Sequence, residues 1–132
     1  MRFELVDRVL EQSDARIVTL KNVTAAEEYL QDHFPTFPVL PGVLMLECMV
    51  QAGRRLVGPG QPLVLGKVRA LKYGRFVRPG DALVSVVTLQ KVEADGSFDL
   101  KGEARVGSAE GPVAASGRFS LRTVRTLTTN PS

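Results

Sequence analysis

Residues 31–53 have the sequence QDHFPTFPVLPGVLMLECMVQAG, in which a proline-rich segment leads directly into a long apolar one. Prolines at positions 35, 38 and 41 exclude a helix and disfavour a central strand before residue 41. Proline is tolerated at the first position of a helix, and the residues after Pro41 are apolar on almost every side. The stretch therefore predicts a stiff extended loop, followed by a mostly buried helix from residue 41 to residue 56 or 57.

The sequence after this helix alternates apolar and polar residues, which is typical of strands. Four strands are predicted there, over residues 63–76, 82–92, 98–106 and 113–121. The segments 94–97 and 107–112 between them have the composition of hairpin turns.

The N-terminal part of the chain adds shorter elements. Residues 15–23 predict a strand, residues 2–9 an entry segment or a short helix, and Thr24 with Glu27 a capping box that starts another short helix. In a chain of 132 residues, this pattern predicts a single α+β domain over 1–132, with a frayed tail from residue 123. A sheet wrapped around one long helix is the economical architecture.

The composition favours an ordinary globular protein. The net charge is only +3, and the chain has two tyrosines and no tryptophan, which argues against a nucleic-acid binder. The single cysteine, Cys48, excludes an internal disulfide and a multi-cysteine metal site. No leader and no membrane-length apolar run is visible, so we expect a cytoplasmic protein without membrane insertion.

Two ionisable residues of the opening stretch are candidates for proton transfer. His33 is the only histidine of the chain, and histidine is the natural base near neutral pH. Glu47 lies in the apolar helix, where loss of water contacts would favour a protonated carboxyl that acts as a general acid. Both residues also have ordinary interpretations, since loop histidines are often surface residues and Glu47 shares a helical stripe with Gln51 and Arg54 that solvent could cover.

The start of the helix is a candidate binding site for an oxygen. The first N–H groups of a helix lack internal partners, and Val39 and Leu40 have no side chain that could cap them. The N–H groups of Gly42 and Val43 are then free for a ligand, and glycine allows a close approach. This arrangement predicts an oxyanion hole for a carbonyl that becomes an enolate.

These residues resemble a known family. The run KNVTAAEEYLQDHFPTFPVLPGVLMLECMVQAG, residues 21–53, is similar to the (3R)-hydroxyacyl-[acyl carrier protein] dehydratases of bacterial fatty-acid synthesis, of the beta-hydroxyacyl "Z" type. LVDRVL at 5–10 and KYGRFVRPGD at 72–81 match further regions of that family. Asp32 and Thr36 stand where the family has glycines.

The resemblance implies a hotdog fold and a homodimer, often assembled further as a trimer of dimers. It implies that His33 removes the proton next to the thioester carbonyl and that Glu47 protonates the departing 3-hydroxyl. Gly42 and Val43 would hold the thioester oxygen, with Gln51 in a supporting role.

The resemblance also implies the substrate and the partner. The chain would act as a lyase in fatty-acid or related lipid and polyketide synthesis, without a metal or redox cofactor, on substrates carried by the phosphopantetheine of an acidic acyl carrier protein. Basic residues that are candidates to meet the carrier, or are merely solvated, are Lys67, Arg69, Lys72, Arg75 and Arg78. Two alternatives stay open: an acyl thioesterase, in which Glu47 activates water, and a non-catalytic acyl or carrier-binding module, which Thr36 motivates.

Overall fold

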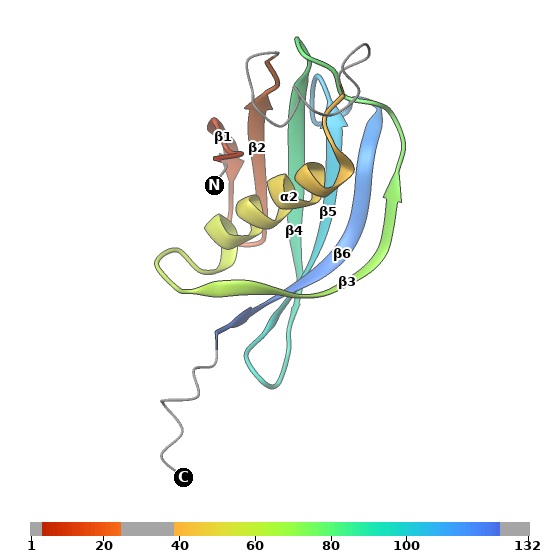
Figure 1. Cartoon of the computed structure of the whole chain (residues 1–132). Helices are drawn as coiled ribbons and strands as arrows, with labels where there is room; N and C mark the ends of the chain where they lie inside the picture. Colours follow the sequence, from red (N-terminus) through yellow and green to blue (C-terminus); the bar gives the residue numbers. More distant parts are fainter. Residues whose placement is uncertain (1–3, 25–38, 125–132) are drawn as a thin grey trace.

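The computed structural model describes residues 4–24 and 39–124, which form one helix and six strands (Figure 1). The elements follow the chain as β1 (Arg8–Gln12), β2 (Arg16–Asn22), α2 (Gly42–Val57), β3 (Leu63–Tyr73), β4 (Ala82–Val92), β5 (Phe98–Val106) and β6 (Val113–Thr123). The short helix predicted after Thr24, the segment that holds His33 and the tail beyond residue 124 lie outside the described residues.

The strands form one antiparallel sheet in the order β1-β2-β4-β5-β6-β3. The sheet is curved, and α2 runs across its concave side while β6 and β3 bend around the helix (Figure 1). All strands except β1 make several contacts with α2. One antiparallel sheet wrapped around one long helix is the α+β hotdog arrangement, which confirms the predicted fold class.

The strands predicted after the helix are confirmed with small differences at their ends. The bounds of β4 and β5 agree with the prediction, and β6 runs two residues beyond the predicted end at Leu121. Strand β3 ends at Tyr73, three residues before the predicted end. Further along, the Val77 carbonyl accepts a hydrogen bond from the Leu40 N–H at 2.7 Å, which ties this segment to the entry of α2.

The prediction for residues 2–9 is wrong at its C-terminal end. Arg8 and Val9 belong to β1, an edge strand that pairs with β2 and has a register shift between Val9 and Glu11. All five residues of β1 are exposed, so the segment has no alternation of buried and exposed positions that would mark a strand.

Helix α2 packs closely on the sheet because two positions at the contact are glycines. Met49 is fully buried, and a Cβ added at Gly102 of β5 would lie 2.7 Å from its Sδ. A Cβ added at Gly53 of the helix would lie 3.2 Å from the Phe119 ring of β6. The missing side chains therefore let the helix and the sheet approach each other.

The helix is buried on its sheet side and open on the other. Its buried residues are Met45, Cys48, Met49, Val50, Ala52 and Gly53. Val43, in contrast, is 68% exposed, and Glu47 is half-buried. Among the described ranges, no helix has both the length and the apolar character that crossing a bilayer requires.

Candidate functional site

The start of α2 presents backbone N–H groups without a cap. Pro41 precedes the helix in an extended conformation and supplies no side-chain hydrogen bond. Its carbonyl accepts the N–H groups of Leu44 and Met45 at 3.0 and 3.3 Å. No acceptor within residues 4–24 and 39–124 bonds the N–H groups of Gly42 and Val43. These two donors can therefore bind an oxygen atom of a ligand.

Tyr73, at the end of β3, lies against this helix start. A Cβ added at Gly42 would be 2.8 Å from two carbons of the Tyr73 ring. No sequence pattern predicted this contact, because the predicted strand continued past Tyr73 and the alternation of residues does not tell where an edge strand meets a helix. A glycine at position 42 therefore leaves room for the Tyr73 ring, and it also lets a ligand approach the Gly42 N–H.

Glu47 lies one turn further along the same helix and is held by a salt bridge. Its Oε1 is 3.3 Å from Arg54 Nη1, and both side chains are a little over one-third exposed. Arg54 is fixed in turn, because its Nε donates to the Leu63 carbonyl at 3.0 Å. In the single chain, Glu47 is therefore paired on a partly solvated face, which is the ordinary interpretation that the sequence left open.

Gln51 connects α2 to the N-terminal segment. Its side-chain carbonyl accepts the backbone N–H of Leu5 at 2.8 Å, and Leu5 is buried. This hydrogen bond thus holds the N-terminal segment against α2, one turn after Glu47.

His33 lies outside the described residues, as do Asp32 and Thr36. The structure therefore places Gly42, Val43, Glu47 and Gln51 along one helix and gives no distance from any of them to the imidazole. Within the described ranges, no three His, Cys, Asp or Glu side chains are grouped as a metal site requires.

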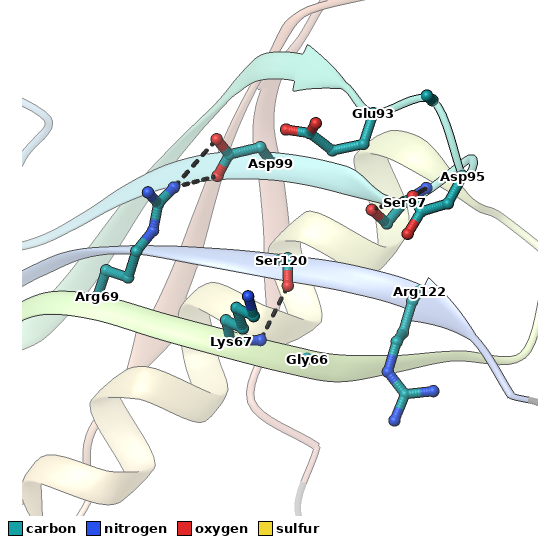
Figure 2. Close-up of a pocket in the computed structure, with 10 residues that line it drawn as sticks. Gly66, Lys67, Arg69, Glu93, Asp95, Ser97, Asp99, Ser120 and Arg122 are labelled. Carbon is teal, nitrogen blue, oxygen red and sulfur yellow. Dashed lines mark hydrogen bonds and ion pairs between the residues drawn. The ribbon is translucent and has the colours of Figure 1, made fainter.

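A cavity of about 770 Å³ opens elsewhere, on the outer face of the sheet (Figure 2). It is lined by Gly66, Lys67, Arg69, Glu93, Ala94, Asp95, Ser97, Asp99, Ser120 and Arg122. Arg69 binds both carboxylate oxygens of Asp99 at 3.2 Å, and the Lys67 N–H donates to Ser120 Oγ at 2.8 Å. Among the described residues, Gly42, Val43, Glu47 and Gln51 do not line this cavity, so its size alone does not make it the active site.

The basic residues that were candidates to meet a carrier protein fall into two groups in the structure. Lys67 and Arg69 line it, and the charge of Arg69 is compensated by Asp99. Lys72, Arg75 and Arg78 follow Arg69 along the chain, around Tyr73 and the helix start, and all three are exposed.

Comparison with known proteins gives the family. The family model of the ApeI-like proteins, described as ApeI dehydratase, matches residues 9–112. The 3-hydroxyacyl-[acyl-carrier-protein] dehydratase FabZ of Polaromonas sp. is 46% identical over 114 residues, which cover 80% of this chain and 78% of that protein. FabZ of Oenococcus oeni is 46% identical over 95 residues, which cover 67% of this chain and 68% of that protein.

Solved structures agree on the fold. The dehydratase heterocomplex ApeI:P from Xenorhabdus doucetiae has a TM-score of 0.69 at 16% identity and covers 91% of this chain and 98% of that chain. The uncharacterized protein PH1136 from Pyrococcus horikoshii has a TM-score of 0.70 at 15% identity, with coverage of 92% and 85%. These structures share the hotdog fold, and the sequence matches carry the family: this chain belongs to the ApeI-like dehydratases, with the FabZ enzymes as relatives.

Proposed function

We propose that this dehydratase removes water from (3R)-hydroxyacyl thioesters carried by an acyl carrier protein and produces trans-2-enoyl thioesters. The family supports the reaction class, and the names of the FabZ relatives support a carrier-bound substrate. The uncapped start of α2 is the structural observation that carries the proposal. Hydrogen-bond donors fixed at that point would stabilise a thioester oxygen as it gains negative charge.

Each residue has one role in the proposed reaction. His33 takes the proton from carbon 2, and the electron pair of that C–H bond moves toward the thioester carbonyl. The N–H groups of Gly42 and Val43 donate to the carbonyl oxygen while it carries the charge. The electron pair then forms the double bond between carbons 2 and 3 as the bond from carbon 3 to oxygen breaks. Glu47 donates the proton with which the hydroxyl leaves as water, and Gln51 supports the helix.

We propose that a second copy of the chain completes the site. Glu47 is more than one-third exposed in the single chain, whereas proton transfer to a leaving hydroxyl needs a site that excludes bulk water. Strand β3 forms one edge of the sheet, and its residues 66–70 are exposed. An exposed edge strand is a template for pairing with another chain, so a homodimer joined through β3 is the assembly that we expect.

The catalytic roles are tested by His33→Ala and Glu47→Gln, with Glu110→Gln as a matched control in an exposed turn. Mass spectrometry of a 3-hydroxyacyl carrier protein distinguishes loss of water from release of the acyl group. We expect each site variant to lower the dehydration rate by about 10²-fold or more, and the control to match the parent protein. Full dehydration by both site variants would contradict the proposed roles.

The same assay separates the alternatives. A thioesterase would release free 3-hydroxy acid, and its loss in Glu47→Gln would assign Glu47 to the activation of water. A non-catalytic module would bind the acyl carrier protein without changing its mass, and Thr36→Gly would not restore turnover. Either result in the parent protein would replace the dehydratase proposal.

A further inference from the structure

We propose that Tyr73 is a positioning residue of the dehydratase site. Its ring borders the site beside the N–H groups of Gly42 and Val43. Its hydroxyl donates a hydrogen bond to the phosphopantetheine arm, the group that carries the thioester. The inference rests on the proposed function, and the sequence did not place Tyr73 in the site.

The ring and the helix start are in direct contact. A Cβ built on Gly42 would lie 2.8 Å from Cε1 and Cζ of Tyr73 and 3.2 Å from its hydroxyl oxygen. Real Cβ atoms essentially never come that close to a ring carbon, so the ring occupies the space that a side chain at residue 42 would need. The phenol edge therefore borders the point where a ligand oxygen would reach the Gly42 N–H.

The backbone on both sides of this contact is fixed. Tyr73 pairs with Ala115 of β6, and the following residue, Gly74, donates its N–H to the Ala114 carbonyl at 2.9 Å. Leu40, just ahead of the helix, donates to the Val77 carbonyl at 2.7 Å. The backbone of Tyr73 and the N–H groups of the helix start therefore keep their relative positions without help from the ligand, as an arrangement that positions a reacting carbonyl requires.

The hydroxyl of Tyr73 is available for a ligand. No hydrogen bond joins it to any residue in the ranges 4–24 and 39–124, and the side chain is 52% exposed. Val43, the second residue of α2, and Phe76, three residues after Tyr73, are also exposed apolar residues. A phenol suits such a place, because its ring contacts an apolar chain while its hydroxyl bonds to an amide of the incoming arm.

The first test compares Tyr73→Ala and Tyr73→Phe in steady-state dehydration of a 3-hydroxyacyl thioester of pantetheine. Val92→Ala is the matched control, because Val92 is equally exposed but lies at the far end of β4. We expect Tyr73→Ala to lower kcat/KM by about 10- to 100-fold with a fall in kcat, because the thioester loses its alignment. Tyr73→Phe keeps the ring and should lose about 10-fold or less, mainly through a higher KM.

A second test measures whether the effect passes through Gly42. Gly42→Ala retains the N–H but forces the ring away, so it should cost activity in the parent and much less in the Tyr73→Ala background. Equal losses in both backgrounds, or a kcat/KM of Tyr73→Ala within twofold of the parent, would overturn the inference. The circular dichroism spectrum at the assay temperature, followed by a thermal unfolding curve, checks that each variant is folded.

Binding gives a readout that does not depend on turnover. The chain has no tryptophan and two tyrosines, so in a Tyr29→Phe background the tyrosine fluorescence comes from Tyr73 alone. The pantetheine thioester should change this fluorescence if the phenol contacts the arm, and no change at saturating thioester would overturn the contact. A parent protein that shows the fluorescence change without dehydration would refute the proposed function and leave the contact intact.

Discussion

The salt bridge between Glu47 and Arg54 contributes too little to explain why a carboxyl lies in this helix. Both side chains are more than one-third exposed, and pairs of that kind stabilise proteins by about 0 to 1 kcal/mol. The salt bridge alone therefore does not account for the carboxyl, and the proposed role of Glu47 as general acid would.

Gln51 offers a prediction about stability at the residue scale. Gln51→Leu removes the acceptor of the buried Leu5 N–H, so the free energy of unfolding should fall by about 1–3 kcal/mol. Denaturant unfolding followed by circular dichroism measures the change. Gln90→Leu is the control, since Gln90 is exposed and substitutions at such positions stay within about 0.5 kcal/mol. Equal unfolding of Gln51→Leu and the control would show that water replaces the lost acceptor.

At the scale of elements, α2 and the sheet depend on one close contact. Met49→Ala should lower the free energy of unfolding by about 2–5 kcal/mol, because Met49 is fully buried against Gly102 and leaves a cavity. Val43→Ala on the same helix removes a side chain that is 68% exposed and should cost almost nothing. Calorimetry measures the stability of both variants. Equal stabilities would contradict this account of the packing.

The elements with a buried side were predictable from the sequence. The apolar residues after Pro41 define α2, β4 is rich in apolar β-branched residues, and β5 alternates clearly between apolar and polar residues. Strand β1 was not predictable, since all its residues are exposed. The two register shifts of β3 and the positive φ of Ala70 were not predictable either, because they come from the bending of the strand around α2.

The candidate site was predictable to a similar extent. The uncapped helix start follows from local rules, since Val39, Leu40 and Pro41 have no capping group. The contact between Gly42 and Tyr73 depends on where two distant segments meet, and no local pattern encodes that. Arg54 was one of two partners for Glu47 that helical spacing allowed, and Arg54 is held in that position by the hydrogen bond from its Nε to the Leu63 carbonyl.

At the scale of the whole molecule, the two edges of the sheet differ. Strand β1 has five residues with a register shift and charged side chains, features that limit pairing with another chain. Strand β3 has eleven residues and carries an exposed apolar side chain at Val68. The edge that leads to the helix start is therefore the one that a second copy can extend.

This difference predicts the effect of a charge placed on β3. Val68→Lys should convert a dimer with twice the 14.3 kDa chain mass to a monomer in light scattering, because lysine on an edge strand opposes pairing. Dehydration should be lost with the dimer, because in the monomer no second copy would shield Glu47 from bulk water. Val92→Lys adds the same charge at an exposed position of β4 and should keep both properties. A parent protein that is monomeric and fully active would refute the shared site, and a dimeric but inactive Val68→Lys would place Val68 in the site rather than in the interface.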